Sequence, residues 1–167
     1  LAEGLGERGF DLSRHVILSG LQNARHPGRL EMLAGNPPIL LDGAHNPSAA
    51  RALRDYVDEF IHQPITMIFG AMRDKALDEL ASILFPAARE VILTELDNPR
   101  AATLENLKAA VPSRLDQTNL HEATSVAEAL RIARRVTDPD GLILITGSLY
   151  LAGAAQESLF ALNPSAH

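Results

Sequence analysis

The stretch ILLDGAHNPSAARAL, residues 39–53, joins an aliphatic run to an Asp-Gly pair and then to a helical pattern. Asp42 follows the aliphatic run, and Asn46-Pro47 is a favourable N-cap and first-turn pair for a helix. A buried strand that passes through a short loop into a helix is the repeating unit of α/β proteins. This stretch therefore predicts such a unit, with Asp42 and His45 in the connecting loop, where Gly43 allows a tight turn.

The same alternation continues along the chain. Short aliphatic runs bounded by Gly, Pro or Asp predict buried strands, and apolar residues at helical spacing between them predict amphipathic helices. We expect strands at 37–42, 65–70, 90–95 and 141–147, a weaker one at 115–120, and helices within 49–60, 77–84, 104–110 and 126–133. A Gly-Asn turn near the start predicts an antiparallel hairpin. The pattern as a whole predicts an α/β fold with a mainly parallel, Rossmann-like sheet of about six strands and helices on both faces.

Composition narrows the class of protein. The chain has 167 residues, 46% of them hydrophobic, which is enough for one compact core. Its formal charge is -6 and its lysines are Lys75 and Lys108, so it lacks a basic track for nucleic acid or an anionic membrane. Without cysteine it can form neither disulfides nor thiolate metal sites, and no apolar stretch reaches the roughly 20 residues of a membrane span. These features favour a cytoplasmic protein without nucleic-acid or membrane partners.

The first residues differ from the rest. Residues 1–25 combine a Gly-rich start with a helix-like segment at 13–24 and contain no strand pattern. The chain also begins with Leu and shows no leader with a small-residue cleavage site. We expect residues 1–25 to be the tail of a preceding domain and its linker, and residues 26–167 to form a C-terminal domain.

The loop after the first long strand is the first candidate site. Ligands of open α/β sheets bind at the carboxyl ends of the strands, where Asp42 and His45 are expected. The helix amino terminus behind them favours an anion or another hydrogen-bond acceptor, and it favours the neutral form of His45. The alternative is that Asp42 and Asn46 only cap the turn and that His45 is a solvated loop residue. The other histidines are scattered without ligand spacing, so the sequence does not indicate a metal site in this chain.

Several segments together resemble a known family. The sequence is similar to the C-terminal domain of the folylpolyglutamate synthase and dihydrofolate synthase family, within the Mur ligase superfamily. The segments that carry the resemblance are GRLE (28–31), ILLDGAHNP (39–47), FGAMRDK (69–75), TELDNPRA (94–101) and ITGSLYLAG (145–153). The DGAHNP and GSLYLAG segments are the most specific, because muramyl ligases tend to carry a different residue where this chain has Gly43.

The resemblance implies ATP-dependent amide ligation. ATP phosphorylates a substrate carboxylate, the amine of L-glutamate attacks the acyl phosphate, and phosphate leaves; the acceptor is a folate, dihydropteroate or both. In the family, the phosphate loop and the magnesium ligands belong to the central domain. This chain contains no G-x-x-x-x-G-K-[ST] motif. We therefore expect the chain to work with the N-terminal and central domains of one enzyme, and to be inactive alone.

The resemblance also implies roles for individual residues. Arg29 would reach the ATP phosphates and act in catalysis, and Asp42 would bind the ribose hydroxyls. His45, the second candidate catalytic residue, would lie beside the nucleotide or the incoming glutamate. Ser148 is first an N-cap, with a contact to the amino-acid substrate as the second interpretation. Arg100, in a DNPR sequence like that of one muramyl ligase, could bind a glutamate carboxylate bidentately.

Each of these assignments has an alternative. Arg29 could be a surface arginine of the hairpin, and the segment around Arg100 could be a strand-end turn made by Asn-Pro. Two other functions also stay open from the sequence: the C-terminal domain of a muramyl-type amino acid ligase, and a nucleotide-binding module without catalysis. Gly43 and the Gly-Ser-Leu-Tyr ending favour the folate ligase.

Overall fold

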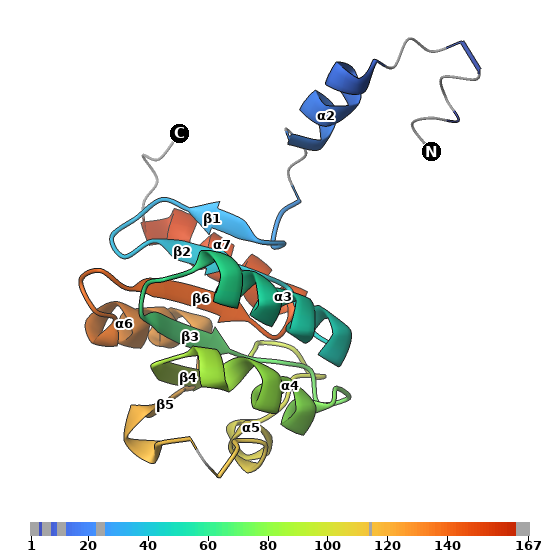
Figure 1. The fold of residues 1–167 in the computed structure, drawn as a ribbon. Helices are drawn as coiled ribbons and strands as arrows, with labels where there is room; N and C mark the ends of the chain where they lie inside the picture. Colours follow the sequence, from blue (N-terminus) through green and yellow to red (C-terminus); the bar gives the residue numbers. More distant parts are fainter. Residues whose placement is uncertain (1–3, 5–7, 10–12, 23–25, 114, 163–167) are drawn as a thin grey trace.

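The molecule is built around one mainly parallel sheet. The structure, a computed structural model, describes residues 4, 8–9, 13–22, 26–113 and 115–162. Its six strands follow the order β1-β2-β6-β3-β4-β5 (Figure 1). Every neighbouring pair is parallel except β1 and β2, which form an antiparallel hairpin. The predicted fold class and the predicted hairpin are both confirmed.

The strands are short and their central members are fully buried. They are β1 (Glu31–Leu33), β2 (Ile39–Leu41), β3 (Ile65–Phe69), β4 (Glu90–Thr94), β5 (Leu120–Ala123) and β6 (Leu142–Thr146). All residues of β2, β3 and β6 are buried. Strands covered on both faces need apolar side chains at every position, which explains the unbroken aliphatic runs in the sequence.

Helices cover both faces of the sheet (Figure 1). The covering helices are α3 (Pro47–Phe60), α4 (Leu77–Leu84), α5 (Leu104–Ala109), α6 (Val126–Val136) and α7 (Leu149–Leu162). The other described elements are the helix α2 (Arg14–Gln22) and the 3-10 turns η1 (Phe85–Ala87) and η2 (Gln117–Asn119). Leu40 and Leu144 pack in one core with α3, α4 and α5. Leu41 and Ile145 pack in a second core with α6 and α7. Successive strand residues thus serve opposite layers, as the pleat requires.

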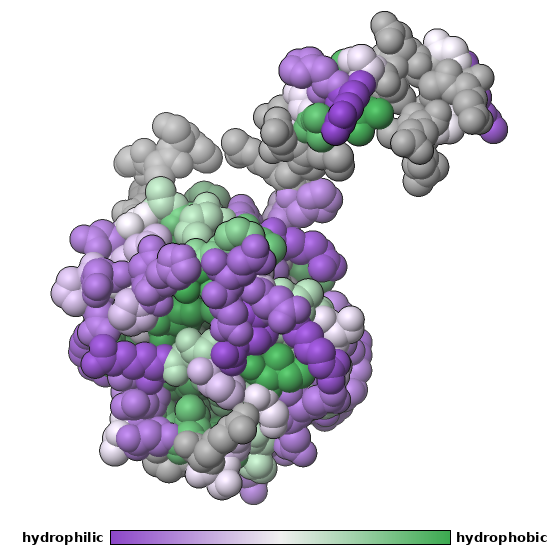
Figure 2. Space-filling view, in the orientation of Figure 1, coloured by the Kyte–Doolittle hydropathy of each residue, from purple (hydrophilic) through white to green (hydrophobic). Residues whose placement is uncertain are grey.

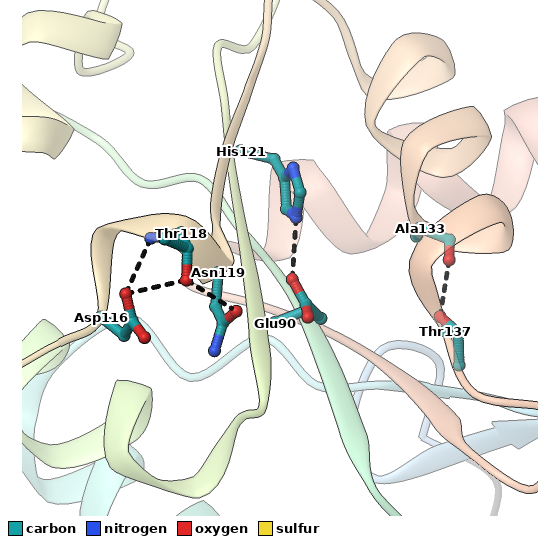
Figure 3. A network of polar contacts seen from close by, with 7 residues as sticks. All are labelled: Glu90, Asp116, Thr118, Asn119, His121, Ala133 and Thr137. Atoms are coloured by element: carbon teal, nitrogen blue, oxygen red, sulfur yellow. Dashed lines mark hydrogen bonds and ion pairs between the residues drawn. The ribbon is translucent and has the colours of Figure 1, made fainter.

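One predicted strand is misplaced. The expected strand at 115–120 is a turn, and β5 begins at Leu120, which pairs with Val91. Asp116 accepts hydrogen bonds from the backbone N–H and the hydroxyl of Thr118, at 2.9 and 2.8 Å (Figure 3). This local turn competes with strand pairing up to residue 119, a usual effect of aspartate beside threonine.

The edge strand β5 is attached by a polar contact as well as by its ladder. His121 Nε2 lies 2.8 Å from Glu90 Oε2 across the β4–β5 pair (Figure 3). Both side chains are half-buried. The partly buried, polar pattern of β5 explains why its apolar signal in the sequence is weak.

Figure 2 shows one face of the molecule, on which hydrophilic side chains predominate, with apolar patches between them. Helix α2 lies apart from the sheet in Figure 1 and matches the expected helical segment at 13–24, whose last two residues lie outside the described ones. Within the described residues, no helix combines the length and apolarity needed to cross a membrane. The division of the chain at residue 25 stays a prediction.

Candidate functional site

The carboxyl ends of four neighbouring strands meet around one hollow. Loops that follow β2, β3, β4 and β6 line a cavity of about 200 Å³. Its lining includes His45, Lys75, Arg100 and Ser148, with Met72, Leu149 and Tyr150 as the less polar part. The structure therefore brings together three of the residues predicted from the sequence, His45, Arg100 and Ser148. Lys75 joins them, a residue to which the sequence alone gives no role.

The hollow lies where the chain changes the face of the sheet that it covers. After β2 the chain enters α3 on one face, whereas after the adjacent β6 it enters α7 on the other. Such a switch point leaves a crevice between two loops, and ligands of open α/β sheets bind in it. Helices α3 and α7 both begin at this crevice; His45 lies just before α3, and Ser148 lies just before α7.

His45 is held by a local contact. Its Nδ1 lies 2.8 Å from the carbonyl oxygen of Gly43, and the side chain is half-buried. Because a carbonyl oxygen only accepts, Nδ1 carries the hydrogen of this bond. The Nε2 atom is then the ring atom that can serve a ligand. The neighbouring Asn46 accepts the backbone N–H of Ala49 at 2.9 Å and caps α3, with Pro47 in the first turn, as predicted.

Ser148 is buried at the start of α7. It is 2% exposed, and its Oγ accepts the backbone N–H of Tyr150 at 3.1 Å. The predicted N-cap is therefore confirmed. The hydroxyl retains its own hydrogen, which it can donate toward the hollow. Its predicted contact with a substrate stays a prediction.

Arg100 belongs to a small charged network at the rim. Its Nη2 lies 3.1 Å from Asp74 Oδ2, and Lys75 Nζ lies 3.6 Å from the same oxygen. Desolvation acts to raise the pKa of Asp74, but Lys75, the backbone and Arg100 together hold that pKa below its ordinary value. Asp74 is thus ionised at neutral pH and occupies the cations that a ligand carboxylate would use. Lys75 could have been found from its place just after a predicted strand on the same edge of the sheet.

Arg29 and Asp42 form a separate part of the site. Arg29 is exposed, lies in the turn before β1, and does not line the hollow. Asp42 Oδ2 accepts the backbone N–H of Leu30 at 3.0 Å, and Oδ1 accepts that of Ala44 at 2.9 Å. The capping role considered for Asp42 is therefore present, and it ties the Arg29 turn to the end of β2.

Gly43 lies between these two parts, where the loop after β2 closely approaches the start of α7. A Cβ atom at this position would lie 2.2 Å from Leu149 Cδ2 at the start of α7. Its φ is not positive, so the backbone conformation there does not itself require glycine. Glycine at this position instead avoids an overlap with the Leu149 side chain. Gly147, with a φ of 109°, is instead a position where the backbone conformation itself favours glycine.

A wider depression adjoins the hollow. It measures about 700 Å³ and lies between the start of α4 and α5, with Arg73, Asp78, Glu79 and Asn106 in its lining. Opposite charges are mixed there and none of the predicted residues takes part. We therefore place the candidate site in the smaller hollow, which combines a buried hydroxyl, an imidazole and two cations.

Comparison with known proteins identifies the family. Residues 28–149 match the family model described as Mur ligase, glutamate ligase domain. This chain belongs to the Mur ligase family. The match begins at the turn that carries Arg29 and ends at the first residue of α7, so it contains Arg29, Asp42 and every lining residue of the hollow except Tyr150.

Individual members of the Mur ligase family are similar over most of the chain. A probable bifunctional folylpolyglutamate synthase/dihydropteroate synthase of Haloferax volcanii is 36% identical over 87% of this chain and 17% of its own length. Folylpolyglutamate synthase of Lacticaseibacillus casei is 37% identical over 90% of this chain and 33% of its own. The chain thus spans a third or less of these two relatives. The resemblance seen in the sequence is confirmed.

Solved structures show the same fold. E. coli FolC in complex with DHPP and ADP superimposes with a TM-score of 0.83 at 25% identity, covering 95% of this chain and 37% of that one. The bifunctional folylpolyglutamate synthase/dihydrofolate synthase with Mn, AMPPNP and L-glutamate bound has a TM-score of 0.76 at 27% identity, covering 92% and 35%.

Proposed function

We propose that this chain is the C-terminal domain of an ATP-dependent amide ligase that adds L-glutamate to folates, dihydropteroate or both. Membership of the Mur ligase family and the functions of the relatives named above support the reaction class. The observation that carries the proposal is the hollow itself. Four loops far apart in the sequence bring an imidazole, a buried hydroxyl and two cations to the switch point of the sheet. An amino acid with two carboxylates matches this set of groups.

The reaction needs a cation near the phosphates. A carboxylate becomes reactive when the phosphoryl group of ATP turns one of its oxygens into a leaving group, which the amine of glutamate then displaces. Charge on the transferred phosphoryl group must be stabilised while this happens. We assign this role to Arg29, whose exposed side chain forms no ion pair or hydrogen bond within the described part of the chain.

The nucleotide contacts proposed for Asp42 are compatible with its structural ones. Each of its oxygens accepts one backbone N–H, from Leu30 or Ala44. A carboxylate oxygen has room for a second hydrogen bond, so Asp42 can also accept a ribose hydroxyl. His45 keeps Nε2 for the nucleotide or the glutamate, because Nδ1 is bonded to Gly43.

The glutamate end of the site uses the hollow. In the proposal Arg100 and Lys75 bind a carboxylate, and Ser148 donates its hydroxyl hydrogen to the same molecule. Arg100 then exchanges Asp74 for the ligand carboxylate, whose planar geometry matches the guanidinium.

In this proposal the phosphate loop and the magnesium ligands lie outside this chain. Among the described residues, no group of three or more His, Cys, Asp or Glu side chains could hold a metal ion. We place the magnesium ligands and the phosphate loop in a preceding central domain, with residues 1–25 as its tail. A cytoplasmic location is part of the proposal, because ATP is available there.

The central test is an activity assay of the full-length protein. We expect ATP-dependent addition of glutamate to dihydropteroate, to tetrahydrofolate, or to both, with phosphate released in equal amount. Turnover with a cell-wall precursor alone would contradict the proposal and favour a muramyl-type ligase.

A pair of serine variants tests the hollow. Ser148→Ala and Ser125→Ala each remove an N-cap serine, from α7 and α6, and each should lose about 1 kcal/mol of stability. Only Ser148 lines the hollow, so only Ser148→Ala should raise the KM for glutamate. If the two variants have the same KM for glutamate, Ser148 only caps α7 and does not bind the substrate.

A further inference from the structure

The turn that carries Arg29 has an unusual backbone. Gly28 has a φ of 68° and Leu30 a φ of 47°. Leu30 is the one non-glycine residue with positive φ in the part of the chain that the structure describes. A leucine is disfavoured in this left-handed region because its Cβ crowds the backbone. Such a conformation persists only where surrounding contacts hold it.

Two contacts attach the turn to the end of β2. The N–H of Leu30 donates to Asp42 Oδ2 at 3.0 Å, and the N–H of Gly43 donates to the carbonyl of Gly28 at 2.7 Å. These bonds hold one side of the turn against the strand end. Because Asp42 is also proposed to bind ribose, its substitution would affect two functions at once.

A second carboxylate holds the other side of the turn. Glu31 Oε2 accepts the backbone N–H of Gly28 at 2.8 Å, and Oε1 accepts the side-chain N–H of Gln156 at 3.4 Å. Glu31 itself is fixed in β1, where it pairs with Leu41. Gly28 is buried, so loss of the carboxylate would leave its N–H without this acceptor.

The contacts on α7 form one stripe. A Cβ on Gly28 would lie 3.3 Å from Ala152 Cβ and 3.7 Å from Leu149 Cδ2. Leu149, Ala152 and Gln156 are spaced by three and four residues and therefore share one face of the helix. The turn thus rests on the same helix whose first residues line the hollow.

We propose that Glu31 is a positioning residue of the ligase: it fixes the left-handed turn 28–30 and thereby the place of the Arg29 guanidinium relative to the hollow. This inference rests on the proposed function of Arg29. Glu31 touches no reacting group. It acts through the main chain of Gly28 on one side and through α7 on the other.

The test compares variants in the full-length enzyme. Glu31→Ala removes both contacts, Glu31→Gln keeps an acceptor for Gly28, and Gln156→Ala loosens only the contact with α7. Glu157→Ala is the matched control, because Glu157 is an exposed glutamate next to Gln156 on the same helix. Arg29→Ala is the reference for loss of the guanidinium.

Kinetics provide the first readout. Glu31→Ala should lower kcat about tenfold or more with the KM for glutamate within about twofold, because the misplaced cation acts only in the transition state. Glu31→Gln and the control should stay within about threefold of the parent, and Gln156→Ala should show a smaller fall in kcat. If Arg29→Ala lowers kcat and neither Glu31→Ala nor Gln156→Ala does, the inference is overturned.

Amide hydrogen exchange of residues 26–31 provides a readout that needs no activity. Glu31→Ala should accelerate this exchange about tenfold, and the control should leave it unchanged. Unchanged exchange in Glu31→Ala overturns the inference. If exchange accelerates but Arg29→Ala leaves kcat intact, then Glu31 holds the turn, the proposed function of Arg29 fails, and the positioning role fails with it. If Glu31→Ala does not fold, Gln156→Ala is used instead: a lower kcat together with faster exchange of residues 26–31 supports the inference, and no change in either overturns it.

Discussion

The two arginines of the candidate site differ in what their guanidinium groups contact. Arg29 has a tightly fixed backbone, because its neighbours Gly28 and Leu30 are bonded to Glu31 and Asp42, while its guanidinium has no ion pair among the described residues. Arg100 is held by both its main chain and its side chain: its carbonyl accepts the N–H of Arg73 at 2.9 Å, its N–H donates to Asn98 Oδ1 at 2.9 Å, and its guanidinium is paired with Asp74. Both main chains are therefore held, but of the two guanidinium groups only that of Arg100 has an ion-pair partner among the described residues.

This difference indicates different tasks. A cation without an internal partner keeps its whole charge for a ligand, which suits stabilisation of charge that develops in a transition state. A cation already paired with an exposed carboxylate gains little when a ligand carboxylate replaces it, since exposed ion pairs are worth about 0–1 kcal/mol. Arg100 is therefore better suited to selecting a carboxylate than to driving the chemical step.

The largest effect should come from the unpaired arginine. Arg29→Ala in the full-length enzyme is expected to lower kcat about a hundredfold or more, because a preorganised charge near the phosphoryl group is lost. Steady-state kinetics at saturating ATP measure this, with Arg134→Ala, an exposed arginine of α6, as control. A kcat within about twofold of the parent, below 0.5 kcal/mol in barrier, would make Arg29 a surface arginine of the hairpin.

The next largest effect is the loss of stability when either of two glycines at the site, Gly147 or Gly43, is replaced by alanine. Gly147→Ala should destabilise the chain by about 2 kcal/mol or more, because φ is 109° and a Cβ would lie 2.7 Å from the carbonyl oxygen of Gly70. Gly43→Ala should cost about 1 kcal/mol, because the Leu149 side chain that it meets is 43% exposed and can rotate away. Urea unfolding measures both.

Gly153→Ala is the control for these glycine variants. A Cβ on Gly153, in the exposed part of α7, meets no atom within 4 Å. Removing a helical glycine should stabilise by about 0.5–1 kcal/mol. Equal stability losses for Gly43→Ala and Gly147→Ala would contradict the expectation that the Leu149 side chain can move away from residue 43.

Arg100→Ala should have a smaller and different effect. We expect the KM for glutamate to rise about tenfold, or 1.4 kcal/mol, with kcat within about threefold, because the lost contact is present in ground and transition states alike. Initial-rate kinetics with varied glutamate measure the two constants. A fall in kcat at unchanged KM would contradict the assigned division of labour between the arginines.

The smallest effect concerns pH. Asp74 has a folded-state pKa below its ordinary value, so its ion pairs contribute stability above the ordinary range of aspartate and lose it as the pH falls through the lowered pKa. NMR titration of the Asp74 carboxyl should therefore show a midpoint below that of an exposed aspartate. Arg100→Ala should move the midpoint upward. An unchanged midpoint would mean that Arg100 is not bound to Asp74 in solution.

Local sequence signals were reliable where the contacts themselves are local. Asn46 and Ser148 cap helices through hydrogen bonds that span two or three residues, so neighbouring residues suffice to predict them. The misplaced strand at 115–120 shows the limit, because the Asp116–Thr118 turn and the ladder with β4 competed for the same residues. Which one prevails depends on the partner strand, whose paired residues lie 29 positions earlier in the chain, as in the pair of Val91 with Leu120.

The sequence by itself determined the alternation of strands and helices, the mainly parallel sheet and the family. These follow from aliphatic runs, helical spacing and short motifs, all of which act within a few residues. Only the tertiary structure decided that Lys75 and Arg100 face Ser148, because β6, the last strand, inserts between β2 and β3. It also decided the left-handed Leu30, which depends on Asp42, twelve residues later in the chain. The physical reason is that pairing between distant segments is selected by burial of the whole sheet, and no short window of sequence contains that information.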